Sequence, residues 1–304
     1  MTDRITPAMV TSQTLSNLTS SLNAIERSSE ELSSGKTILE PSDNPYGASR
    51  VIDLQSQLEG LSSYEGNAQN GIEWENTASS AMSSMSSAVQ RVRELTLQAA
   101  NGTINQSDRE AIATQVEQLT ESIKQDANTQ FGGEYVFSGT DTLTAPYQQG
   151  ENDEYQGNAE SIARAVGPGA TVTISTNLSS VLGNGPKAED GGLLDTLRTI
   201  AKNLRGGTAE DIKEVSTTNL QSLDKNREAL VELQAVAGSA TDQLQSAVAR
   251  NEDLQSSITQ ALSSTDATNV AATSIAYANE QAAYQAALRA GATIVQESLL
   301  NFLQ

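Results

Sequence analysis

The chain has 304 residues, of which 37% are hydrophobic and 4% aromatic, and its 38 acidic and 18 basic residues give a net charge of -20. This balance repels polyanions, so nucleic acid and anionic lipid are poor candidates as partners. Cysteine and histidine are both absent, which excludes thiolate nucleophiles, disulfides, the usual zinc ligands and every histidine-based acid-base site.

The sequence shows neither a membrane span nor a cleaved signal peptide. No stretch approaches the roughly 18 consecutive apolar residues of a membrane helix. The segment from Met1 to Val10 lacks a basic region followed by an apolar core. If the protein leaves the cell, we expect it to be exported by a route without a cleaved signal peptide.

The first predicted helix carries an apolar seam with alternating spacings of three and four residues. The seam consists of Leu15, Leu18, Leu22, Ile25 and Leu32, with Ser29 in the remaining slot. This spacing is typical of a coiled coil. The helix is expected to stop at Ser33-Ser34-Gly35, and the run Pro41-Ser42-Asp43-Asn44-Pro45 predicts an extended loop. Residues 1–46 should therefore form an N-terminal assembly helix and loop.

A second seam runs from Val51 to about Ala99, which corresponds to about 75 Å of helix at 1.5 Å per residue. This length predicts a rod, because globular helices are usually shorter. After a break at Asn101-Gly102, Ser107 and Glu110 match a capping box and predict the start of the next helix. We expect residues 47–131 to form the N-terminal half of a helical rod.

Strand signals appear next, in a segment rich in glycine. Tyr135-Val136-Phe137 is a strand candidate, and Gly167-Pro168-Gly169 separates two further candidates, residues 163–166 and 171–174, as in a hairpin. We expect a β-containing surface insert over residues 132–190.

This insert contains a group of acidic residues, and grouped carboxylates are candidate metal ligands. Glu151, Asp153 and Glu154 lie beside Tyr155 but lack the ligand order and the glycine of an EF-hand loop. A solvated loop is the favoured interpretation. We expect no catalytic, cofactor or metal site in the chain.

Helical spacing returns after the insert and continues to the end of the chain. Residues 191–264 should form the C-terminal half of the rod, and residues 265–304 a C-terminal assembly helix. Because each amphipathic helix is marginal alone, the N-terminal helices must pack against the C-terminal ones. The predicted fold is mainly α, a long coiled-coil rod with a small β-containing insert.

The apolar seams at both ends of the chain have two interpretations, which periodicity alone leaves equally open. They could close an ordinary intramolecular bundle, or they could stay incompletely paired and dock on neighbouring subunits. The residues that we expect to be buried in an assembly are Leu15, Leu18, Leu22, Ile25, Leu32, Leu288, Ile294, Leu299, Leu300 and Leu303.

Several segments of the chain are similar to the flagellin superfamily. The run from Leu32 to Pro45, followed by Ala48-Ser49-Arg50, resembles the superfamily signature, and the segments 133–140, 166–169 and 298–303 agree with it. The proline-flanked loop resembles the hook-filament junction family more than filament flagellin, although Tyr46 replaces a smaller residue. The signature positions are Gly35, Lys36, Pro41, Ser42, Asp43, Asn44, Pro45 and Arg50.

The resemblance implies a structural protein of the bacterial flagellum rather than an enzyme. It implies export through the flagellar type III channel, an extracellular location, and subunit packing through the terminal helices. The implied partners are hook-associated protein 1, flagellin, further copies of this chain in a ring, and an export chaperone.

Two other functions remain as alternatives. A filament flagellin would be the bulk component of the filament, whereas a junction protein would be a trace component. A secreted coiled-coil adhesin would need a cluster of exposed aromatic residues in the insert, where Tyr147 and Tyr155 are the candidates.

Overall fold

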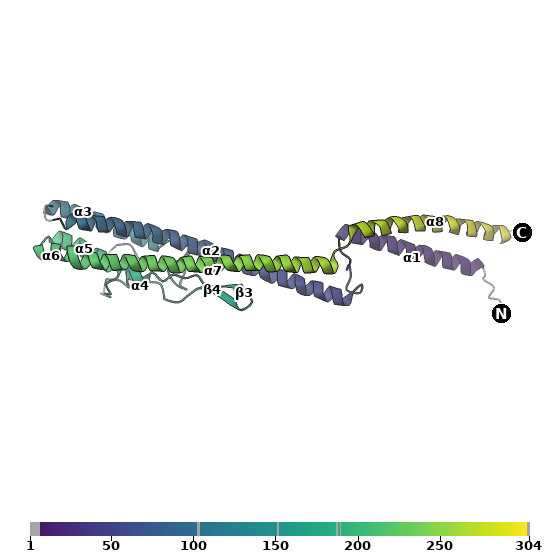
Figure 1. The fold of residues 1–304 in the computed structure, drawn as a ribbon, viewed down its shortest axis with the longest axis horizontal. Helices are drawn as coiled ribbons and strands as arrows, with labels where there is room; N and C mark the ends of the chain where they lie inside the picture. Colours follow the sequence, from purple (N-terminus) through teal and green to yellow (C-terminus); the bar gives the residue numbers. More distant parts are fainter. Residues whose placement is uncertain (1–6, 102–103, 151, 187, 189, 303–304) are drawn as a thin grey trace. The chain divides into compact units, whose positions relative to one another are not determined.

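The computed structural model describes residues 7–101, 104–150, 152–186, 188 and 190–302, with side chains near the two ends described from Met9 to Thr293. The chain divides into two compact units, one of residues 1–60 with 254–304 and the other of residues 61–253. The mainly helical fold with a small β-containing insert, predicted from the sequence, is confirmed (Figure 1).

The first unit contains the two terminal helices, α1 (Pro7–Ser34) and α8 (Val270–Phe302). They pack side by side and run antiparallel, so that α1 begins where α8 ends (Figure 1). The helix α1 stops at Gly35, whose φ of 71° is left-handed and whose N–H binds the Glu31 carbonyl at 2.9 Å. The helix α8 starts after Asn269, whose side chain accepts the Ala272 N–H at 3.2 Å.

The second unit holds the principal core. Much of it comes from the parts of two long helices, α2 (Pro45–Ala99) and α7 (Leu220–Asp266), that lie within residues 61–253, together with α3 (Gln106–Ala127) and α5 (Leu193–Gly206). The short helices α4 (Ser179–Leu182) and α6 (Ala209–Glu214) and a π-helical turn at Val215–Asn219 complete its helices as described. The largest fully buried side chains include Trp74, Met82, Met85, Ile123, Phe137, Tyr147, Ile174, Leu178 and Leu182.

Two antiparallel hairpins form the β part of the described chain. Strand β1 (Gln130–Phe131) pairs with β2 (Glu134–Tyr135), and β3 (Ala163–Gly167) pairs with β4 (Ala170–Thr173). The predicted β3–β4 hairpin is confirmed. The strand predicted at residues 135–137 is shorter than expected, because Val136 and Phe137 leave the ladder and are buried in the core.

The predicted capping box at Ser107 is wrong. The α3 N-cap is Asn105, whose side chain accepts the Asp108 N–H at 2.8 Å, so Ser107 already lies within the first turn. A capping box does occur in α6, where Thr208 Oγ1 accepts the Asp211 N–H at 3.1 Å and the Asp211 carboxylate accepts the Thr208 N–H at 3.0 Å.

The buried face of α7 follows seven-residue steps through Leu223, Leu230, Ala237 and Leu244. The apolar Val236 and Leu254 lie outside this face and are 58% and 44% exposed. The small Ala237 allows the helix to pack closely.

Candidate assembly surface

The packing of α1 divides its predicted seam into two parts. Leu18, Ile25 and Leu32 are half-buried in the α1–α8 pair, whereas Leu15 is 67% exposed and Leu22 is 40% exposed. The first three residues are spaced by sevens and so share one face, while Leu15 and Leu22 share the adjacent one. Half of the seam therefore stays outside the pair within the described chain.

The α8 helix packs against α1 through a face of mixed side chains. Its half-buried or buried positions at spacings of three and four are Thr273, Tyr277, Glu280, Tyr284, Ala287 and Gly291. Leu288 is 44% exposed and Ile275 is 65% exposed. The side chains of Ile294, Leu299 and Leu300 are not described, and Leu303 lies outside the described residues. The assembly role of the ten residues that we expect to be buried between subunits stays a prediction.

The signature loop is joined to the turn between α7 and α8 by a small two-stranded contact, which we call the clasp (residues 35–38 with 266–268). The Asp266 carbonyl accepts the Thr37 N–H at 2.7 Å, and its carboxylate accepts the Ile38 N–H at 3.0 Å. The Thr268 N–H binds the Gly35 carbonyl at 3.0 Å. The clasp therefore ties segments from opposite ends of the sequence together, independently of the α1–α8 packing.

Asp43 organises the remainder of the loop. One carboxylate oxygen accepts the N–H groups of Leu39 and Glu40, each at 3.1 Å, and the other accepts a bond from Arg27 at 3.0 Å. The Glu40 N–H, followed by the Leu39 N–H and the Arg27 charge, lowers the pKa of Asp43 below its ordinary value. An ionised carboxylate thus holds the loop against the end of α1.

The loop ends by capping α2. Asn44 Oδ1 accepts the Gly47 N–H at 2.9 Å, and Pro45 occupies the first helical position, where a missing N–H costs nothing. A Cβ at Gly47 would lie 2.6 Å from Ile38 Cδ1, so only glycine allows this close approach. The other signature residues, Lys36, Pro41, Ser42 and Arg50, are exposed.

Replacing Asp266 with alanine should open the clasp locally. The change removes the acceptor for the Ile38 N–H, at a cost of roughly 1–2 kcal/mol, which corresponds to about tenfold faster amide exchange at Ile38. Asn at this position keeps an acceptor oxygen and should behave like wild type. Hydrogen exchange measured by NMR or mass spectrometry checks this, with the exposed Glu252→Ala as control. Equal exchange rates of the Ile38 amide in Asp266→Ala and wild type would show that this hydrogen bond does not stabilise the clasp.

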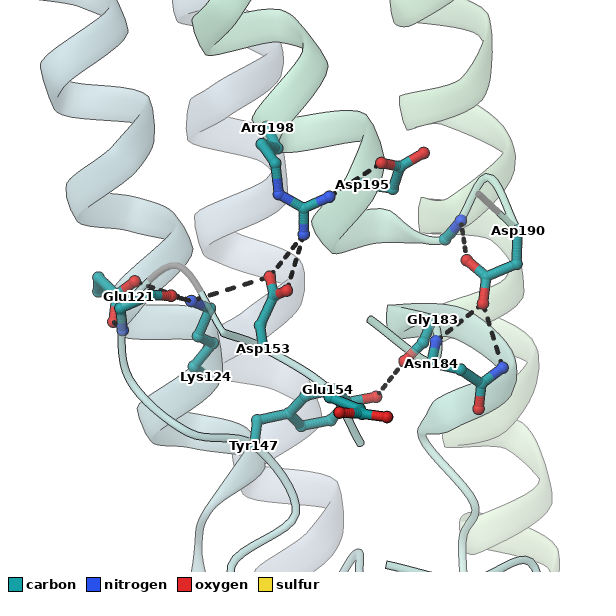
Figure 2. Close-up of polar contacts among 12 residues, drawn as sticks. Glu121, Lys124, Tyr147, Asp153, Glu154, Gly183, Asn184, Asp190, Asp195 and Arg198 are labelled. Carbon is teal, nitrogen blue, oxygen red and sulfur yellow. Dashed lines mark hydrogen bonds and ion pairs between the residues drawn. The ribbon is translucent and has the colours of Figure 1, made fainter. Parts of the chain in front are cut away.

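A buried ionic cluster in the second unit was missed by the sequence interpretation (Figure 2). Asp153 is 3% exposed and accepts two bonds of 2.8 Å from Arg198, while Lys124 Nζ lies 3.8 Å away. Lys124, itself 2% exposed, also donates to Glu121 at 2.8 Å and to the Gly150 carbonyl at 2.5 Å. The solvated-loop interpretation is therefore wrong for Asp153.

The other carboxylates of that loop have different positions. Glu154 is exposed, as predicted, and Glu151 lies outside the described residues. A groove of about 820 Å³ between α3 and α5 borders the cluster. Of its four cations, Lys124, Arg198 and Arg205 pair with carboxylates of this chain, and Lys202 is exposed. We therefore interpret the cluster as a structural tie between α3, α5 and the insert.

The described residues contain neither a membrane-spanning helix nor a group of metal ligands. In that part of the chain, no helix is both long enough and apolar enough to cross a membrane. Within the same residues, no three acidic side chains are grouped so as to hold a metal ion.

Comparison with known proteins finds two similarities in sequence. Residues 5–142 match the bacterial flagellin N-terminal helical region. The flagellar hook-associated protein 3 of Escherichia coli strain K12 is 27% identical to this chain. The alignment is 304 positions long and covers 94% of this chain and 95% of that protein.

Solved structures agree on the fold. A putative flagellar hook-associated protein from Vibrio parahaemolyticus has a TM-score of 0.68 at 19% identity, covering 74% of this chain and 100% of its own. The flagellar junction protein FlgL from Legionella pneumophila has a TM-score of 0.58 at 15% identity, covering 71% and 99%. The N-terminal part of the chain is thus similar to the flagellin N-terminal helical region, and the similarity to flagellar hook-associated protein 3 extends over nearly the whole chain.

Proposed function

We propose that this chain is a structural subunit of the bacterial flagellum that joins the hook to the filament. The observation that carries the proposal is the similarity to flagellar hook-associated protein 3, which covers 94% of the chain. The exposed half of the α1 seam supports it, because an assembly subunit needs apolar surface that its own fold leaves free.

The proposed mechanism is burial of the terminal helices between neighbouring subunits. Leu15, Leu22 and Leu288 would each contribute roughly 1.5–3 kcal/mol if fully buried in the assembly. Hook-associated protein 1 on one side, flagellin on the other and further copies of this chain in a ring are the proposed partners. An export chaperone would cover the same residues before assembly.

A filament flagellin is the second candidate, since the flagellin model matches the N-terminal helical region. That match ends at residue 142, whereas the hook-associated relative matches 94% of the chain. Quantitative mass spectrometry of isolated flagella separates the two functions. A junction subunit should be present at a small fraction of the flagellin, and a comparable abundance would favour the flagellin assignment.

The adhesin alternative depended on exposed aromatic residues in the insert. Tyr147 is 1% exposed, and its hydroxyl donates to the Gly183 carbonyl at 2.8 Å. Tyr155 is half-buried, donates to the Phe137 carbonyl at 2.8 Å and packs against Tyr147. Both rings stabilise the insert from within, so neither offers a platform for a ligand.

Deleting residues 299–304 should abolish incorporation into flagella while leaving the second unit folded. The deletion removes Leu299, Leu300 and Leu303, three of the proposed assembly residues, and none of these belongs to the unit of residues 61–253. Complementation of a deletion strain, scored by filament number, tests incorporation, and circular dichroism of the purified chain tests folding. Normal filaments on complemented cells would contradict the proposed role of the C-terminal segment.

A further inference from the structure

The face that α1 presents within the α1–α8 pair mixes large apolar side chains with small and polar ones. Its half-buried or buried positions include Val10, Thr14, Leu18, Ser21, Ile25, Ser28 and Leu32, and the α8 positions given above are two tyrosines, one threonine, one glutamate, one alanine and one glycine. Because Leu18, Ile25 and Leu32 are spaced by sevens and small and polar side chains lie between them, α1 presents nearly the same face after a slip of one heptad, so this face alone specifies the register weakly. Something else must select one register.

One polar contact connects the two helices near the clasp. Ser28, which is 8% exposed, donates from Oγ to Glu280 Oε2 at 2.7 Å. A polar pair of this kind favours the register in which it is satisfied, because a slip leaves a half-buried carboxylate without its donor. A slip of half a heptad would place Glu280 beside Ile25 or Leu32 and is disfavoured for that reason.

A full heptad slip is not excluded by this bond alone, because it would bring Ser21 opposite Glu280. The second determinant lies toward the other end of the pair. Gly291 is buried, and a Cβ at this position would lie 3.1 Å from Thr14 Cγ2. In that slipped register, Tyr284 would take the place of Gly291 at this close approach, and its ring would crowd Thr14.

We infer that Ser28, Glu280 and Gly291 are positioning residues that set the register of α1 on α8. The inference rests on the proposed assembly function, because the register decides which side chains remain outside the pair. In the observed register, Leu15 and Leu22 are exposed. A slipped α1 would present them at a different height relative to Ile275 and Leu288, and a neighbouring subunit would meet a mismatched surface.

The test uses the full chain, which has no cysteine, so spin labels attach only at introduced sites. Nitroxides at S20C and A286C, two exposed positions on α1 and α8, report register by double electron-electron resonance. We expect one distance in wild type. Glu280→Leu should add a second distance, because a leucine at this position can lie beside Ile25 or Leu32 after a slip of three or four residues, about 5 Å along the helices, while thermolysin resistance of the terminal helices stays equal or rises.

Incorporation into flagella should fall at least tenfold in Glu280→Leu although the helix pair is not weakened. A merely structural role would instead move stability and incorporation in the same direction. Glu280→Gln keeps an oxygen that accepts the Ser28 hydroxyl bond and should retain both the single distance and incorporation. Gln281→Leu, at an exposed neighbouring position, controls for added apolar surface and should also leave both unchanged.

A single distance in Glu280→Leu would overturn the inference. So would normal incorporation despite a second distance, because register would then not matter for assembly. Absence of the wild-type protein from flagella would instead refute the proposed function, while the distance measurement would still decide the register.

Discussion

Replacing Glu75 with glutamine is expected to remove a large part of the pH dependence of the free energy of unfolding between about pH 4.5 and pH 8. Glu75 is 1% exposed, and its Oε2 has no hydrogen-bond partner among the described residues. Burial without a partner penalises the charged form and raises the pKa of Glu75 from 4.5 to about 8.

The direction of the effect follows from proton linkage. Between these two values the folded chain keeps a proton on Glu75 that the unfolded chain releases, so the free energy of unfolding falls as pH rises. The contribution is fully present below about pH 4.5 and is lost by about pH 8. At 1.36 kcal/mol per pKa unit, the difference amounts to roughly 5 kcal/mol. Glutamine stays neutral and carries no such dependence.

Urea unfolding at pH 5 and pH 8.5 measures this difference for each variant. Glu73→Gln is the matched control, because Glu73 is exposed on the same helix, and it should keep the wild-type pH dependence. If Glu75→Gln loses as much stability as wild type over this range, the carboxyl is not buried in the protonated state and the packing described around α2 is incorrect.

Replacing Asp153 with alanine should destabilise the second unit by about 3 kcal/mol. The change leaves the buried Lys124 and the partly exposed Arg198 without the carboxylate that they share, and breaking a buried ion pair costs about 3–5 kcal/mol. We expect the lower end of that range, because Lys124 keeps Glu121 and Arg198 keeps Asp195. The urea midpoint at constant slope measures the loss.

Glu154→Ala provides the control for this experiment. Glu154 is the next residue but is exposed, so its removal should change the free energy of unfolding by less than about 0.5 kcal/mol. Equal effects of the two substitutions would mean that Asp153 is solvated, as the sequence alone had indicated.

Local signals in the sequence predicted most of the helices and the larger hairpin. Gly35 and Pro45 mark the two ends of the signature loop, and Gly167-Pro168-Gly169 marks the β3–β4 turn. Each acts through its own backbone preferences, so its effect can be inferred without knowledge of the fold. The π-helical turn at Val215–Asn219 has no such signal and was missed.

The contacts between distant segments could not be inferred in the same way. Asp153 was interpreted as a solvated carboxylate because Lys124 and Arg198 lie far from it in sequence and approach it only in the folded chain. Ser28 and Glu280 are unremarkable polar residues until α1 and α8 pair. One usable signal was present at Asp266–Asn269, where a polar break between two helical patterns marks the turn that forms the clasp.

The leucine seam illustrates a different limit. Periodicity identified the apolar residues of α1 correctly, but it could not tell which of them α8 would cover. The structure leaves Leu15 and Leu22 exposed, which favours the interpretation that the terminal seams are incompletely paired in the single chain.

The most direct test of the proposed function is immunogold electron microscopy of isolated flagella, with an antibody against residues 141–190 of the insert. The junction function predicts gold confined to a band where the hook meets the filament. Gold along the whole filament would contradict it and identify a flagellin. Flagella without gold would show that the chain is not a component of the flagellum.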